Sequence, residues 1–168
     1  LRSTLALLVV AIGLGIYIYI DADRVPAGTA DALETVFDFE SDDVSRISIL
    51  AENGDETVIE KAADRWGLVA PFEGNVDVPA VVGLASSIAD LEMQRVVAEP
   101  EDAVDLSAFG LTPPRITVGV AATTGADGRL LLGERTPTGG DVYATLDGSN
   151  RVFLISGYLD DTFNQTTF

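Results

Sequence analysis

Sixteen consecutive residues from Leu5 to Ile20 carry no charge and no strongly polar group, and the next residue, Asp21, is acidic. At about 1.5 Å per residue, an α-helix over this run is about 24 Å long. The four preceding residues extend it to the roughly 30 Å thickness of a bilayer core. The sequence therefore predicts a transmembrane helix over residues 1–20.

An apolar run of this kind is either a retained membrane anchor or a cleaved secretory signal. A signal peptide ends in small residues, whereas this run ends in the bulky sequence IYIYI. The stretch AGTADA at 27–32 is an alternative cleavage region, but it lies well beyond the run. Arg2 before the run and the acids after it favour an N-terminus in the cytoplasm. We expect a retained single-pass anchor.

Two groups of residues within the span have expected roles. Tyr17 and Tyr19 lie near its outer end, and tyrosine is typical of the interface between lipid and water. Ala11 and Gly15 form a small-xxx-small pair, with Gly13 on another face, and such residues let a neighbouring helix approach closely. The alternative is that small residues are simply common in spans. We expect this helix to pack against other integral membrane subunits.

The rest of the chain is strongly acidic. From Asp21 onward, 27 acidic residues stand against 9 basic ones, and the whole chain carries a net charge of −17. Such a domain repels nucleic-acid phosphates, so we expect no nucleic-acid partner. Acidity can also serve only to keep a domain soluble. A protein partner would meet either an acidic face or an apolar patch with an acidic rim.

The chain contains no cysteine and no histidine. Disulfides, thiolate zinc sites, thiol nucleophiles and triads with an imidazole base are therefore excluded. A catalytic site would have to use carboxylates, hydroxyls, arginines or Lys61. The sequence identifies no catalytic residue, metal ligand or cofactor site, and we expect a protein that is not an enzyme and binds no cofactor.

Residues 21–43 are polar and acidic, and they predict a juxtamembrane linker. The chain from 44 to 168 then predicts one α+β domain, in which a mainly antiparallel sheet packs on one or two helices. Alternation in VSRISIL (44–50) predicts a strand with Ile47 and Ile49 facing inward, and Asn53-Gly54 predicts a type I′ hairpin turn after it. Further strands are expected at TVIEKA, RWGLVAP, RVVAE, RITVGVAAT, RLLLGER, DVYATL and RVFLIS.

An apolar stripe predicts a helix over 77–93, with Asp77 as its N-cap and Pro79 in its first turn. The stripe consists of Val81, Leu84, Ala85, Ile88 and Leu91. We expect this helix to cover one face of the sheet. A short helical turn is expected to end at Gly110, where Pro113-Pro114 prevents continuation, and GYLDDTF is expected to begin a last helix.

Several motifs have both a structural and a functional interpretation. Trp66, the only tryptophan, is expected in the core rather than as a ligand platform, and FGLTPP (109–114) as a backbone corner. GERTPTGGD (133–141) lacks the lysine and helix of a phosphate-binding loop. The acid pairs Asp21/Asp23, Asp42/Asp43 and Asp160/Asp161 lack calcium-loop spacing, and Asn164-Gln165-Thr166 matches a glycosylation acceptor, which we interpret as coincidence.

The order of these signals over roughly residues 44 to 160 resembles the DUF4340 domain, an uncharacterised bacterial domain often found behind a membrane span. The most specific pieces are the tryptophan strand ending at Pro71, the FGLTPP corner and the LLLGERTP…VYA hairpin pair. Family members often accompany the gliding-motility type of ABC transport system. The resemblance therefore implies an extracytoplasmic accessory component, although this chain holds one copy of a domain that many members repeat.

Two functions from different classes remain. The first is a non-catalytic single-span accessory subunit of a larger bacterial membrane complex, either ABC-transporter-associated or another assembly such as an energy-converting one. It would lie in the inner membrane, with its lipid-embedded N-terminal helix against partner subunits and its periplasmic domain on an extracytoplasmic protein. The alternative is a membrane-tethered carboxylate-dependent enzyme or small-ligand receptor, which predicts convergent acids in a pocket. We expect the first.

Overall fold

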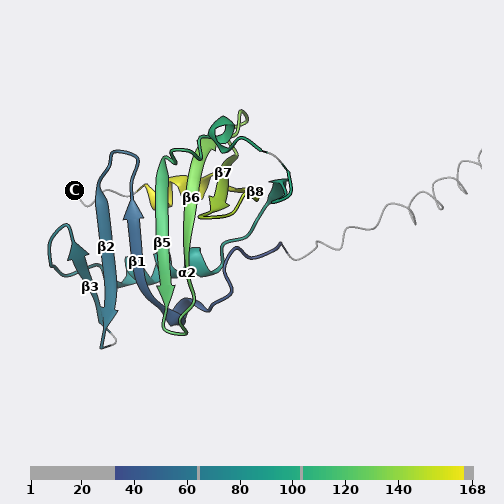
Figure 1. Cartoon of the computed structure of the whole chain (residues 1–168). Coiled ribbons are helices and arrows are strands. Elements are labelled where there is room, and N and C mark those ends of the chain that lie inside the picture. The colour runs from purple at the N-terminus through teal and green to yellow at the C-terminus, as the bar shows by residue number, and fades with distance from the viewer. Residues whose placement is uncertain (1–32, 64, 103, 165–168) are drawn as a thin grey trace, which may run out of the picture. The chain divides into compact units, whose positions relative to one another are not determined.

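A single antiparallel sheet dominates the computed structural model, which describes residues 33–63, 65–102 and 104–164. Within these residues eight strands pair in the order β3-β2-β1-β5-β6-β7-β8-β4 (Figure 1). Their bounds are β1 Val44–Leu50, β2 Glu56–Ala62, β3 Arg65–Ala70, β4 Arg95–Ala98, β5 Ile116–Ala122, β6 Asp127–Arg135, β7 Asp141–Leu146 and β8 Val152–Ser156. The prediction of a mainly antiparallel sheet with few helices is confirmed.

The sheet has a buried inner face, where the core lies. In β5 every second residue is buried, beginning with Ile116, because successive strand side chains point to opposite faces. Ile47 and Ile49 of β1 face the same core, as the alternation predicted. The core also contains Phe153 of β8 and Phe163 near the C-terminus, and burial of each large apolar side chain contributes about 1.5–3 kcal/mol.

Two α-helices lie behind the sheet in Figure 1, α2 (Val78–Ala89) and α3 (Tyr158–Phe163). Asp77 caps α2 as predicted, since its carboxylate accepts a hydrogen bond of 3.4 Å from the Ala80 backbone N–H. The helix ends at Ala89 rather than at residue 93. Leu91 and Met93 continue its apolar periodicity, but their backbones instead bond Val36 and Glu34 at 2.8 Å.

Helix α2 connects strands at opposite edges of the sheet. It follows β3 at one edge and precedes β4 at the other, where β4 pairs with β8. The buried side of α2 presents Val81, Ala85 and Ile88 to the core. One helix thereby covers the inner face between the two edge strands.

The compact unit begins at Glu34 rather than at residue 44. Val36 and Phe37 are buried in the core, and the Phe37 and Phe39 rings stack with centroids 5.3 Å apart. A short 3₁₀ turn, η1 (Ser41–Asp43), then leads into β1. The last part of the segment predicted as a linker, 34–43, therefore belongs to the folded domain.

The β1–β2 hairpin forms where Asn53-Gly54 predicted it, but with a different turn. A type I′ turn needs a positive φ at both central positions. Gly54 has a φ of +88°, but Asn53 does not have a positive φ, because Ala63 is the only described non-glycine residue that does. Gly54 N–H instead bonds the Ala51 carbonyl, and Ala51 N–H bonds Asp55. This is the three-residue hairpin loop with one left-handed glycine.

Part of the outer face is covered by the segment that contains a second 3₁₀ turn, η2 (Leu106–Phe109). Leu111 is buried there against Val152 and Ala98, and the Phe109 and Tyr143 rings lie 4.9 Å apart. The turn ends at Gly110, with a φ of +69°, as predicted. A β-carbon on Gly133 of β6 would lie 2.0 Å from the Phe109 carbonyl oxygen, so backbone meets backbone at this corner.

No helix in the described parts of the chain combines the length and apolar character needed to cross a bilayer. The predicted span over 1–20, with its expected packing residues Ala11, Gly13 and Gly15 and interface residues Tyr17 and Tyr19, lies outside the described residues. The transmembrane helix therefore stays a prediction.

We expect Gly133→Ala to lower the free energy of unfolding by about 2–3 kcal/mol, because the new methyl group must displace the Phe109 backbone. Gly83→Ala on α2 is the matched control, since a β-carbon there meets no atom within 4 Å. It should raise stability by about 0.5–1 kcal/mol through helix propensity. Urea unfolding followed by Trp66 fluorescence measures both. Equal effects of the two substitutions would contradict the close contact.

Candidate docking site on the outer face of the sheet

A groove runs along β5 on the part of the outer face that η2 leaves uncovered. β5 supplies its floor, while β1 and β6 supply its walls with every second side chain. In Figure 1 no helix lies in front of these three strands. Strand pairing aligns the lining side chains in three rows across the groove: Arg46–Ala121–Asp127, Ser48–Gly119–Arg129 and Leu50–Thr117–Leu131.

Small residues on the middle strand, Gly119 and Ala121, line the floor of the groove. Two adjoining hollows of about 450 Å³ each share Ser48, Arg129 and Asp147 and together follow β5. A β-carbon on Gly119 would lie 2.4 Å from the Ser48 hydroxyl oxygen, so glycine leaves room for that hydroxyl. The groove passes from a charged end at Arg46 and Asp127 to a second end, called the apolar end, where the apolar side chains of Leu50, Pro114 and Leu131 lie together beside Glu56.

The charges along the groove are exposed, and each arginine pairs with an exposed carboxylate. Arg46 pairs with Glu60 of β2, and Arg129 lies 3.3 Å from Asp147. The side chains of Arg46 and Arg129 are 52% and 60% exposed, and ion pairs with this exposure contribute little stability. Their partners can therefore be exchanged when another charged group enters the groove.

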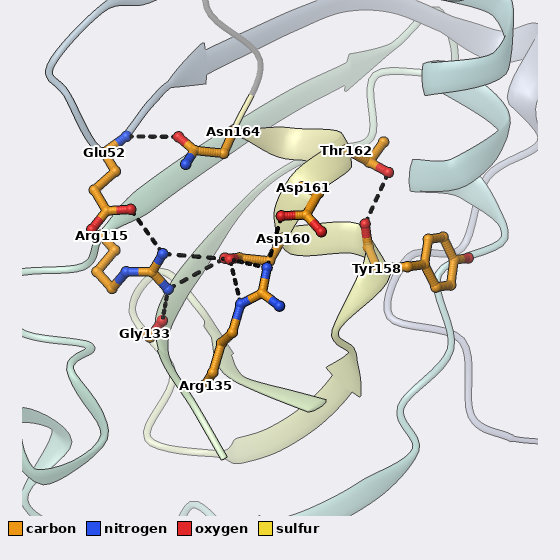
Figure 2. Close-up of polar contacts among 9 residues, drawn as sticks. All are labelled: Glu52, Arg115, Gly133, Arg135, Tyr158, Asp160, Asp161, Thr162 and Asn164. Atoms are coloured by element: carbon orange, nitrogen blue, oxygen red, sulfur yellow. Dashed lines mark hydrogen bonds and ion pairs between the residues drawn. The ribbon is translucent and has the colours of Figure 1, made fainter. Parts of the chain in front are cut away.

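A second charged cluster surrounds Asp160 on α3 (Figure 2). The Asp160 carboxylate is almost fully buried, and it accepts hydrogen bonds from Arg115 at 3.3 Å and from Arg135 Nε at 2.9 Å. Arg115 also donates to Glu52 at 2.8 Å, and Arg135 to Asp161 at 2.8 Å. The cluster thus joins α3 to the start of β5, the end of β6 and the β1–β2 hairpin.

This arrangement gives the Asp160/Asp161 pair, which lacks calcium-loop spacing, a place in ion pairs of the fold. Both carboxylates face guanidinium groups, which neutralise them and occupy their oxygens. Hydrogen bonds from Arg115 lower the pKa of Glu52, and hydrogen bonds to Glu52 and Asp160 raise the pKa of Arg115. Asn164, in the predicted acceptor motif, accepts a hydrogen bond from the Glu52 backbone N–H at 3.2 Å.

Arg151 ties the beginning of the domain to β8. Its two terminal nitrogens bond the Glu34 carboxylate at 2.8 and 2.9 Å, and its Nε lies 3.2 Å from Glu99. Hydrogen bonding to Arg151 lowers the pKa of Glu34. The bidentate pair therefore fixes residue 34 at the point where the compact unit starts.

The other candidates from the sequence have structural positions. Trp66 packs against the main core, with Lys61 Nζ 6.0 Å from its ring. The glycine-rich loop packs on the start of α3, where Gly157 N–H bonds the Gly140 carbonyl at 2.8 Å. Asp43 lies in η1, and its carbonyl accepts from Thr123 N–H. Asp21 and Asp23 lie outside the described residues.

The groove was not predicted from the sequence. Two signals were present: the alternation in β1 already assigned Arg46, Ser48 and Leu50 to the face opposite the core, and Gly119 interrupts an apolar strand. A glycine inside a strand often marks a close approach by another group. The pairing of β1 with β5, which brings these residues together, joins strands that are distant in the chain.

We expect Asp160→Asn to lower the free energy of unfolding by about 3 kcal/mol, because it leaves two guanidinium groups around an uncharged, buried side chain. Asp161→Asn is the matched control, since Asp161 is 80% exposed, and it should change stability little. Denaturant unfolding of both variants at pH 7 tests this. Similar losses in the two variants would contradict a central role for Asp160.

The lowered pKa values of Glu34 and Glu52 predict a pH dependence of stability. A carboxylate whose pKa is lower in the folded state contributes its full stabilisation to the fold above its ordinary pKa of 4.5. This contribution is lost as the pH falls through the pKa of the folded state. The decline in unfolding free energy below pH 4.5 should be shallower in Glu34→Gln and Glu52→Gln than in the native chain. Glu73→Gln, an exposed control, should keep the native slope.

Comparisons with known proteins find one match. A family model described as a domain of unknown function (DUF4340) matches residues 66–168, which is more than half of the chain. No curated protein and no solved structure matches significantly. The matched range contains β5 and β6, which form the floor and one wall of the groove, and begins after β1. The chain belongs to the DUF4340 family.

Proposed function

We propose that this protein is a non-catalytic accessory subunit of a larger bacterial membrane complex and that its domain binds a partner protein on the periplasmic side. The observation that carries this proposal is the outer face of the sheet, which the η2 segment covers in one part and which forms a groove along β5 in another. The complex is an ABC-type transport system or another membrane assembly, such as an energy-converting one.

The distribution of charged contacts supports a binding role. Arg115, Arg135 and Arg151 make ion pairs that join distant parts of the fold. The arginines of the groove, in contrast, are exposed and pair with exposed carboxylates. Groups that remain accessible on an open surface suit contacts with a second macromolecule.

The position of the lowered carboxylate pKa values favours binding over the alternative, a carboxylate-dependent enzyme or small-ligand receptor. Such a site gathers acids of displaced pKa in one pocket. Glu34 and Glu52, whose pKa is lowered, lie outside the groove and serve ion pairs of the fold. Asp105, also lowered, accepts hydrogen bonds from the backbone and side chain of Ser107 in its own turn.

The proposed anchor is the helix predicted over residues 1–20, retained in the bacterial inner membrane with its N-terminus in the cytoplasm. Its small residues Ala11 and Gly15 would contact a partner helix, because small side chains allow close backbone approach. Glu34, held by Arg151, would then mark where the tether enters the periplasmic domain.

We expect a C-terminally tagged chain, extracted from its native membranes in mild detergent, to purify with at least one integral membrane protein in a fixed ratio. Gly15→Ile should reduce that recovery, since a bulky residue blocks close helix packing. Gly13→Ile, on another face of the same helix, is the matched control and should retain the partner. Native gel electrophoresis with mass spectrometry measures the ratio. Recovery of a free monomer from both native and variant membranes would contradict the proposal.

A further inference from the structure

We propose that the outer-face groove binds a positively charged, amphipathic segment of the partner protein, an inference that rests on the proposed function. The segment would lie along β5, with basic side chains toward the carboxylates of the groove and an apolar side chain at the end formed by Leu50 and Leu131. Three features of the described residues carry this assignment: the dimensions of the groove, its charge and its apolar end.

The dimensions suit one secondary-structure element. The walls, β1 and β6, flank a single strand, so they stand two strand spacings apart, about 9.5 Å. From the Arg46 row to the Leu50 row the groove spans five residues of β1, four steps of about 3.3 Å or about 13 Å. An α-helix with its side chains is about 10–12 Å across, wider than this spacing, so the groove suits one extended segment. The backbone N–H and C=O groups of β5 are already paired with β1 and β6, so side chains must provide the recognition.

The charge of the groove is negative, like that of the whole domain. Three carboxylates line it, those of Asp127, Asp147 and Glu56, and a fourth, that of Glu60, lies beside it on β2. Each guanidinium has one carboxylate as a partner: Arg46 has Glu60 and Arg129 has Asp147. The remaining two are Asp127 at the charged end and Glu56, which pairs in register with Leu50 at the apolar end. In the described chain neither carboxylate has a hydrogen-bond or ion-pair partner. Two unpaired acids at opposite ends favour a segment that carries two basic residues.

The apolar end of the groove lies next to the part of the outer face that the η2 segment covers. Leu131 packs against the cluster around Leu111, so one side of it is held by the η2 segment. Its other side, with Leu50 and Pro114, borders the groove. Leu50 is 46% exposed. An apolar partner side chain placed here would extend the contact that Leu106, Phe109 and Leu111 make, from β6 across β5 to β1.

Site-specific photocrosslinking in native membranes tests this assignment. A photoreactive phenylalanine analogue replaces Leu50 in the full-length chain, and in a control chain it replaces Val82 on α2. The two positions are 46% and 49% exposed and lie on opposite faces of the sheet. We expect a protein crosslink from position 50 and none from position 82, with the crosslinked peptide containing at least two lysines or arginines around an apolar residue.

A charge variant tests the role of the two unpaired acids in the same experiment. Asp127→Asn combined with Glu56→Gln should lower the crosslink yield from position 50 about fivefold. Glu73→Gln with Glu101→Gln removes the same charge from exposed positions outside the groove and should leave the yield unchanged. Raising the salt from about 0.05 M to about 0.5 M should also lower the native yield, because it screens exposed charges.

The outcomes separate this inference from the proposed function. A basic crosslinked peptide whose yield falls in the double groove variant supports the inference. A crosslink only from position 82, an acidic or neutral peptide, a lipid adduct or a second copy of this chain would each overturn it, while a co-purifying complex still supports an accessory subunit. Absence of any co-purifying membrane protein overturns the proposed function and this inference together.

Discussion

The fold depends on burial of one face of a single continuous sheet. The inner-face side chains of β1, β5, β6, β7 and β8 form one apolar cluster, and α2 and α3 exclude water from it. A single sheet has a second face, which the same helices cannot reach. The chain covers the β6–β8 part of that face with the η2 segment and leaves the groove along β5. The candidate site is therefore a consequence of how far the cover extends.

Electrostatics divide the molecule into a fixed part and an adaptable part. With 27 acidic residues against 10 basic ones, guanidinium groups are scarce, and three of those in the described chain, Arg115, Arg135 and Arg151, are held in place by the fold. Asp160 shows the reason: a buried carboxylate needs charged hydrogen-bond donors, and it receives two. Arg46 and Arg129 lie on the open face, where solvent weakens their pairing and another protein can compete for it.

Local patterns in the sequence predicted much of the fold, because strands, caps and turns depend on neighbours in the chain. The strand at 44–50, the Asp77 cap and the Gly110 corner were all predicted from such patterns. The predicted end of α2 at residue 93 was wrong, because Leu91 and Met93 keep a helical spacing in the sequence but their backbones bond Val36 and Glu34. The pairing of β1 with β5, and with it the groove, depends on contacts across the chain that no local pattern records.

The position of β4 at the far edge of the sheet has a consequence for biogenesis. Its residues, 95–98, come before β5 in the chain, yet their partner strand β8, residues 152–156, is the last strand of the described sheet to be made. Contacts between distant segments form late because a long loop must close first. The edge strand therefore keeps the backbone groups that pair with β8 exposed until residues 152–156 have been made, and incomplete chains present an open strand edge during that interval.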